Sequence, residues 1–133
     1  MEAGEVTDVR SVGRINREIY KCVTPDIVTD EVVITEERIA HIQERHPDDY
    51  ERFVSYIPQI INAPDFIVEA NKANTAVLLK EIEEQGDRFK LILRIKVESD
   101  PAEYKNSVLS FWHIGETTWK KTLKNKKILY KRE

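Results

Sequence analysis

The 133-residue sequence has little cysteine, since Cys22 is the single one. One thiol excludes an internal disulfide framework and suits a reducing compartment. Free cysteines are mostly packed and inert, so we expect Cys22 to be a buried thiol rather than a nucleophile. The sequence also lacks a long apolar run, at its start or elsewhere. We therefore expect neither a secretory signal nor a membrane span, and a cytoplasmic protein, or one delivered to the cytoplasm of a target cell by sequences outside this chain.

An excess of basic residues is missing as well. The 21 Lys and Arg are outnumbered by 24 Asp and Glu, which gives a formal net charge of −3. Total charge alone therefore does not indicate a nucleic-acid partner. The distribution is uneven, however, because acidic residues gather in the first half and the C-terminal region is basic. The cations of that region, almost unopposed by acid, are Lys120, Lys121, Lys124, Lys126, Lys127, Lys131 and Arg132.

The first half of the chain shows helical patterns. The length and the 41% of hydrophobic residues predict a single domain over residues 1–133. Thr35 is a plausible N-cap, because two glutamates follow it, and this helix must end or bend before Pro47. Asp48 can cap a second helix with apolar residues at helical spacing, which we expect Pro58 to break. Residues 18–23 form a weaker pattern and are a candidate strand.

The second half changes to a period of two, which is typical of strands. We expect strands at residues 66–69, 76–82, 89–97, 107–114 and 128–130, with a short helical segment at 117–123. Consecutive strands with short connections predict an antiparallel sheet. The sequence therefore predicts an α+β fold with N-terminal helices packed on a C-terminal antiparallel sheet of about four to five strands.

The strand expected at 89–97 has the strictest alternation in the chain. Its apolar residues share one face, and the other face carries Arg88, Lys90, Arg94 and Lys96. A cationic face can neutralise phosphates, and an open antiparallel sheet leaves one face free to bind a strand. A solvated face held by salt bridges explains the same pattern, so both interpretations stay open.

Two of the three histidines lie on the first helix. A helix-borne zinc pair needs His at i and i+4, as in H-E-x-x-H, whereas His41 and His46 are five apart. Because the chain also lacks a cysteine cluster, we expect no metal and no cofactor. Arg45 lies four residues after His41 and so shares its helix face. For either histidine, capping or packing is the structural alternative to chemistry.

Hydroxyls, aromatics and a histidine alternate along the strand expected at 107–114. Alternation puts Leu109, Phe111 and His113 on one face and Ser110 and Trp112 on the other. Neither face is purely apolar, as expected where one side meets a core and the other a site. Trp112 can stack on a base, although a core aromatic is the simpler interpretation.

Several short motifs stand in a distinctive order and spacing along the chain: residues 34–39 and 41–47, 57–61 with 64–65, 106–112, and 126–131. Their order and spacing resemble those of the phage-associated branch of the barnase–EndoU–colicin–RelE nuclease superfamily. The similarity runs from about Gly13 to the C-terminus. Where the family often has threonine, this chain has Ser110, which keeps the hydroxyl.

The resemblance implies a barnase- or RelE-like fold and a metal-independent endoribonuclease. In such enzymes the ribose 2′-hydroxyl attacks the adjacent phosphate and gives a 2′,3′-cyclic phosphate. On this basis His46 and His41 are the acid–base candidates, with His46 slightly preferred, Arg45 stabilises the phosphate and Ser110 hydrogen-bonds to it. Candidate substrate-binding residues are Arg88, Lys90, Arg94, Lys96, Trp112 and His113.

Two other functions fit the same residues. One is a catalytically inactive module of the same fold that binds RNA or a protein. The other is a toxin-like ribonuclease that cuts a particular RNA, such as tRNA or ribosome-bound RNA, and is controlled by an inhibitor or immunity protein. Retention of histidines, an arginine and a strand hydroxyl favours an enzyme over the binding module.

Overall fold

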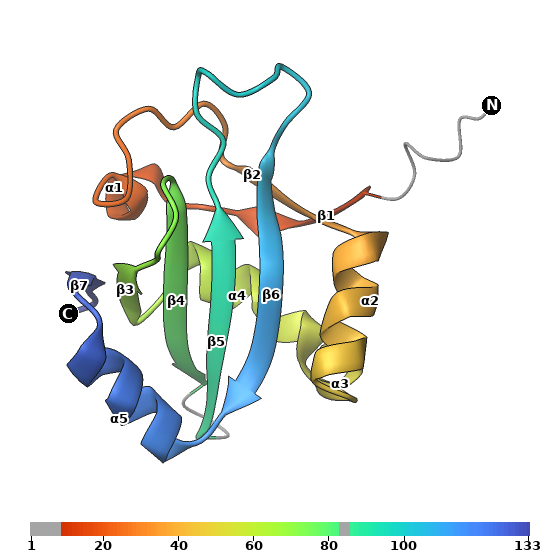
Figure 1. Ribbon diagram of the computed structural model, residues 1–133, viewed down its shortest axis with the longest axis vertical. Coiled ribbons are helices and arrows are strands. Elements are labelled where there is room, and N and C mark those ends of the chain that lie inside the picture. The colour runs from red at the N-terminus through yellow and green to blue at the C-terminus, as the bar shows by residue number, and fades with distance from the viewer. Residues whose placement is uncertain (1–8, 83–85) are drawn as a thin grey trace.

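The computed structural model describes residues 9–82 and 86–133, so the first eight residues, on which part of the signal prediction rests, lie outside them. The described chain is built on one mixed sheet of seven strands in the order β1-β2-β6-β5-β4-β3-β7 (Figure 1). The strands are β1 (Val9–Arg14), β2 (Glu31–Thr35), β3 (Phe66–Glu69), β4 (Thr75–Ile82), β5 (Asp87–Arg94), β6 (Asn106–Ile114) and β7 (Ile128–Lys131).

Along the described chain, the helices all lie between these strands. They are α1 (Arg17–Tyr20), α2 (Glu36–Arg45), α3 (Asp49–Phe53), a 3-10 turn (Val54–Tyr56), α4 (Ile57–Asn62) and α5 (Glu116–Asn125). The predicted α+β class is correct. The predicted sheet was too small, because β1 and β2 precede the main helices and β2 pairs with β6 in parallel. None of the described helices has the length and apolar composition needed to cross a membrane.

Local capping explains where several helices begin. Thr35 caps α2 as predicted, since its hydroxyl accepts a hydrogen bond from the Arg38 N–H at 3.1 Å. Asp48 occupies the N-cap position of α3 but makes no capping bond there, and its φ of 72° is left-handed. Pro58 does not break a helix. It lies in the first turn of α4, where its missing N–H is not needed, and the break comes earlier, in the 3-10 turn.

The candidate strand at residues 18–23 is wrong, because this segment starts with helix α1. The Asn16 side chain accepts a hydrogen bond from the Glu18 N–H at 3.1 Å and so caps the helix. Cys22 follows α1 and is exposed, which corrects the expectation of a buried thiol. Partial desolvation nevertheless raises the pKa of the Cys22 thiol, which disfavours the reactive thiolate.

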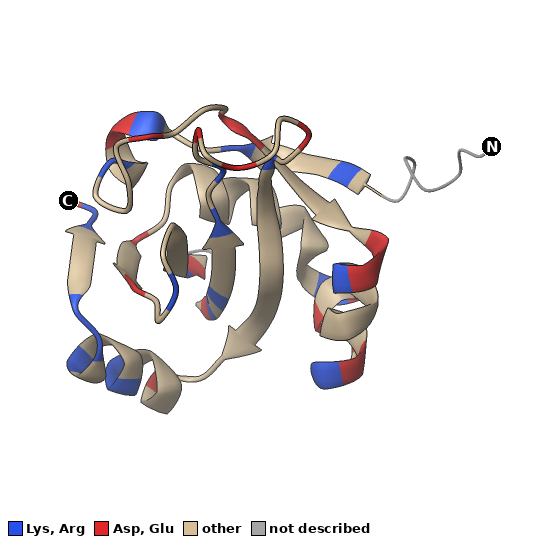
Figure 2. Ribbon diagram, turned by 45° about the horizontal axis from the view of Figure 1, so that its top comes forward, with Lys and Arg blue, Asp and Glu red and all other residues tan. Residues whose placement is uncertain are grey.

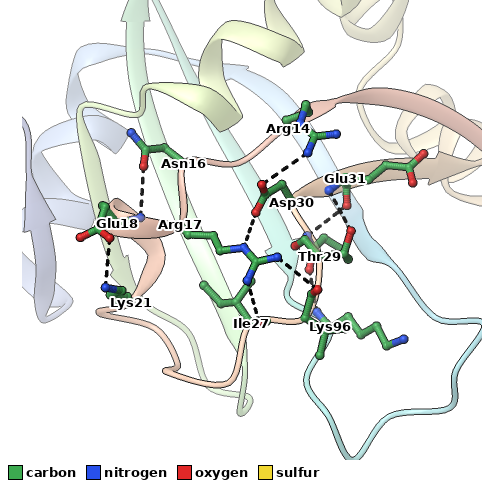
Figure 3. A network of polar contacts seen from close by, with 12 residues as sticks. Arg14, Asn16, Arg17, Glu18, Lys21, Ile27, Thr29, Asp30, Glu31 and Lys96 are labelled. Carbon is green, nitrogen blue, oxygen red and sulfur yellow. Dashed lines mark hydrogen bonds and ion pairs between the residues drawn. The ribbon is translucent and has the colours of Figure 1, made fainter.

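A polar network holds the segment between α1 and β2 in place (Figure 3). Arg17 donates to the Asp30 carboxylate at 2.5 Å and to the Ile27 carbonyl at 3.3 Å. Arg14 approaches the same carboxylate at 3.4 Å. The hydrogen bond from Arg17 is the main reason why the pKa of Asp30 lies below its usual value. This network therefore holds in place a segment that belongs to no helix or strand and lacks their regular backbone hydrogen bonds.

The two faces of the sheet have different roles. On one, the core face, side chains such as Leu78, Leu91 and Phe111 are fully buried against the isoleucines of α2 and α4. On the other, the pocket face, α5 packs Trp119 and Leu123 against part of the sheet only. Figure 1 shows α4 behind the sheet and α5 in front of it. The pocket face is therefore partly covered and partly open.

A bulge in β6 corrects the predicted alternation of that strand. Ile92 of β5 pairs with Ser110, but the next residue, Leu93, pairs with Val108, so Leu109 is an extra residue. Val108 and Phe111 consequently both point into the core, although they are three residues apart. The bulge leaves Ser110 on the pocket face.

Asn106, at the start of β6, joins three segments of the chain through hydrogen bonds of its side chain. It is fully buried, and its carbonyl oxygen accepts a hydrogen bond from the Lys96 N–H at 2.8 Å. Its amide group donates to the carbonyl oxygens of Thr29 at 2.7 Å and Glu31 at 3.0 Å. One side chain thus satisfies backbone groups at the entry to β2 and just after β5.

We predict that Asn106→Ala lowers the free energy of unfolding by about 3 kcal/mol. The change leaves the Lys96 N–H without its acceptor and the carbonyl oxygens of Thr29 and Glu31 without this donor. Asn125→Ala, an exposed change at the end of α5, should alter it by less than about 0.5 kcal/mol. Chemical denaturation of both variants checks this. Equal stability of the two variants would contradict the anchoring role of Asn106.

Candidate active site

A pocket of about 410 Å³ lies on the pocket face of the sheet. Its floor follows one row of paired residues, since Val77 of β4 pairs with Ile92 of β5, and Ile92 pairs with Ser110 of β6. Arg38 and His41 line it from α2. These two residues are three apart and so share a face of the helix. The remaining walls come from the turn between β3 and β4 and from Lys126, in the link between α5 and β7.

The pocket is cationic in an acidic chain. Arg38, Lys72, Lys90 and Lys126 line it, and no acidic side chain is among the described residues that do so. The chain as a whole has a formal net charge of −3. Figure 2 shows mostly basic residues on α5 and the link to β7, whereas α1 and α2 carry both signs. A concave site of one charge sign concentrates ligands of the opposite sign, so this pocket is suited to an anion.

Lys90 has the most unusual surroundings of these cations. Its ammonium group lies 3.5 Å from the Thr122 hydroxyl and 5.6 Å from the centre of the Trp112 ring. Burial lowers the pKa of Lys90, and the neighbouring charge of Lys126 lowers it further. A lysine with a lowered pKa releases its proton more readily, which is the property that a general acid needs.

His46 stacks flat on Trp112. The ring centroids are 4.8 Å apart and the ring planes differ by 3°. Burial is the main cause that lowers the pKa of His46, and the charges of Arg45 and His41 act in the same direction against that of Asp49. His46 does not itself line the pocket, whereas Trp112 does. The histidine therefore supports the wall of the pocket from outside.

The fold brings four of the predicted site residues together. His41, Lys90, Ser110 and Trp112 all line the pocket, although they come from α2, β5 and β6. Their convergence was expected from the resemblance and not from any local pattern. Whether they act on a substrate stays a prediction.

Arg94 and Lys96 lie elsewhere. Asp100 holds the Arg94 guanidinium with two hydrogen bonds, at 2.9 and 3.1 Å. Lys96 lies beyond the end of β5, is buried, and donates to the Ala102 carbonyl at 2.9 Å. Both side chains thus organise the loop between β5 and β6, so these two of the four cations expected on one face of this strand do not line the pocket.

Arg45, Arg88 and His113 also lie outside the pocket. Arg45 is exposed at the end of α2. Arg88 pairs with Glu81 on β4 at 3.5 Å. The His113 ring contacts Asp87 at 3.1 Å, near the far end of β6. The structure therefore gives these three predicted residues no place beside His41 and Ser110.

The structure adds residues that the sequence analysis missed. Arg38 lines the pocket from the same face of α2 as His41, and a search for cations three residues before a histidine could have found it. Asn71 and Lys72 come from the turn between β3 and β4, whose approach depends on the fold. Lys126 was noted only as part of a basic tail.

The donor set of the pocket is poor in metal ligands. Its described lining residues supply one imidazole, from His41, and no carboxylate or thiolate. Across residues 9–82 and 86–133, no group of three His, Cys, Asp or Glu side chains is placed to hold a metal ion. The cations that the described lining offers to a bound anion are Arg38, Lys72, Lys90 and Lys126.

A family model described as phage-Barnase-EndoU-ColicinE5/D-RelE like nuclease2 matches residues 8–131. The chain belongs to this family. The resemblance inferred from the sequence is confirmed, and with it a phage-associated nuclease of the barnase, EndoU, colicin and RelE type. No curated protein and no solved structure matches the chain.

The burial of His46 predicts that the stability of this nuclease depends on pH. Because the folded state lowers the pKa of His46, the stabilisation that it gives is full above the unfolded pKa of about 6.5 and is lost as the pH falls through the folded pKa. We predict that His46→Phe, which keeps a ring for the stack, removes this part of the pH dependence. Denaturation at about pH 7.5 and about pH 5 measures it. An NMR titration that gives His46 an unshifted pKa would contradict it.

Proposed function

We propose that this nuclease is a metal-independent endoribonuclease that cuts RNA in the pocket between α2 and the sheet. The observation that carries the proposal is the combination of one imidazole, the Ser110 hydroxyl and four cations around a pocket whose described lining has no acid. A phosphodiester fits this charge, and the ribose 2′-hydroxyl supplies the nucleophile that RNA has and DNA lacks.

The proposed reaction uses two proton transfers. His41 takes the proton of the 2′-hydroxyl, and the 2′-oxygen then attacks the adjacent phosphorus. The bond from phosphorus to the 5′-oxygen breaks, and the Lys90 ammonium gives its proton to that oxygen. The products are a 2′,3′-cyclic phosphate and a 5′-hydroxyl. The lowered pKa of Lys90 supports the assignment of the acid.

Charge develops on the phosphate oxygens as the new bond forms. Arg38 and Lys126 line the pocket on opposite sides of its floor, one from α2 and the other after α5. Preorganised cations of this kind stabilise a transition state more than the ground state. Ser110, held on the pocket face by the β6 bulge, donates a hydrogen bond that orients the phosphate in this proposal.

His46 has a positioning role in this proposal. It stacks on Trp112, and Trp112 is the register partner of Lys90. Lys90 in turn lies near the Trp112 ring. His46 therefore acts on the site through two side chains rather than on the substrate, which replaces our first expectation that it transfers a proton.

We predict that the protein cleaves RNA in the presence of EDTA and that His41→Ala lowers the rate by about 10²–10⁴-fold, the range expected for a lost acid–base group. Mass spectrometry should find 2′,3′-cyclic phosphate ends. An oligonucleotide with one 2′-deoxyribose at the cleaved position should stay intact there. His113→Ala, the matched change outside the pocket, should keep nearly full activity.

Two results would count against this function. Full activity of folded His41→Ala would remove this residue from the site. Intact RNA after incubation with the folded wild type, with or without divalent ions, would instead favour an inactive module that binds RNA or protein.

We also predict that His46→Phe keeps most of the cleavage activity and that His46→Ala loses about tenfold or more, since only alanine removes the stack. The measurement is kcat for one RNA over a range of pH. A positioning role leaves the shape of the pH profile unchanged in His46→Phe. If phenylalanine is as damaging as alanine, His46 takes part in proton transfer.

A further inference from the structure

The ammonium groups of several lysines of α5 and the segment after it have no acidic partner, although the backbone N–H of Lys127 donates to the Glu69 carboxylate at 3.4 Å. Lys121, Lys124 and Lys127 are exposed, and none of their ammonium groups forms an ion pair within the described part of the chain. Lys120, by contrast, pairs with Glu116 at 2.9 Å. Figure 2 shows this basic stretch along α5 and the link to β7.

Several exposed cations elsewhere in the fold are paired. Arg10 contacts Glu36 at 2.7 Å, and Lys105 contacts Glu31 at 2.8 Å. Lys21 contacts Glu18 at 3.0 Å. The first half of the chain thus neutralises many of its cations internally, whereas the stretch around α5 leaves its lysines free for an anion from outside.

Bringing these lysines together is unfavourable without such an anion. Lys121 and Lys124 are three apart in one helix, and Lys120 and Lys124 are four apart, so like charges lie on neighbouring turns. Like charges at these spacings destabilise a helix. A bound polyanion would remove that repulsion.

The packing of α5 directs Lys121 and Lys124 away from the sheet. Trp119 and Leu123 pack on the sheet, which leaves Lys121 and Lys124 exposed. Lys126 follows the helix directly and lines the pocket. The exposed lysines are therefore continuous with the cationic rim of the candidate active site.

We propose that Lys121, Lys124 and Lys127, the lysine track, bind the phosphodiester backbone of the RNA strand outside the pocket. The pocket, at about 410 Å³, has the size of a small-molecule site and holds only a short part of a strand. The track would give affinity for longer RNA without reading its sequence. The inference rests on the proposed function in one respect, that the strand held is RNA.

Binding to phosphates has a characteristic dependence on salt. Each neutralised phosphate of a single strand releases counterions and contributes about 0.7 to the slope of log K against log salt concentration. The substitutions Lys121→Gln and Lys124→Gln together should therefore reduce the slope by about 1.4 and weaken binding by about tenfold at low salt.

The experiment uses a labelled single strand of about 20 nucleotides with 2′-O-methyl riboses, because it carries the same phosphates and lacks the proposed nucleophile. Fluorescence anisotropy gives Kd at several salt concentrations. The matched control is Lys21→Gln with Lys105→Gln, which changes the net charge equally but lies just after α1 and on the loop before β6. We expect the control to bind within about twofold of the wild type.

The outcomes separate this inference from the proposed function. Equal binding of the two double variants, or no binding by the wild type, overturns the lysine track. Weaker binding of the track variant alone supports it, even if the wild type cleaves no RNA, in which case only the enzymatic proposal fails. Cleavage of a dinucleotide, which is too short to reach the track, should be unchanged in the track variant.

Discussion

The bulge in β6 is the constraint on which the site depends. Successive strand residues point to opposite faces, so a strand without the bulge could not place Val108 and Phe111 in the same core and Ser110 in the pocket between them. The extra residue, Leu109, shifts the alternation by one. The fully buried Asn106 fixes the strand just before this shift. Core packing and the chemistry of the pocket are thereby set by a single irregularity.

The sequence predicts the elements whose cause is local. Thr35 caps its helix through a hydrogen bond three residues away, and the strands that match best alternate between a buried and a less buried face. β1 and β2 were missed because their signal is not local. β1 contains Gly13, where a side chain would lie 2.9 Å from Ile61 of α4, and β2 pairs in parallel with a strand more than seventy residues later.

The same distinction applies to the site. Sequence spacing placed His41 and His46 on one helix, but the neighbours of the two rings decide their roles. Trp112 stacks on His46, whereas His41 lines the pocket. Likewise, the cations expected on one face of β5 include Arg94, which a loop carboxylate six residues later holds in place. Partners made by the tertiary fold cannot be seen in a periodic pattern.

The order of the elements along the chain determines when the pocket is completed during synthesis. α2 and the central strands leave the ribosome first, whereas Lys126 belongs to the short link between α5 and β7. That last strand pairs with β3, an element from the middle of the chain. The rim of the pocket is therefore completed only after the central sheet has been made. A ribosome that produces this nuclease holds an incomplete pocket until translation has passed residue 126.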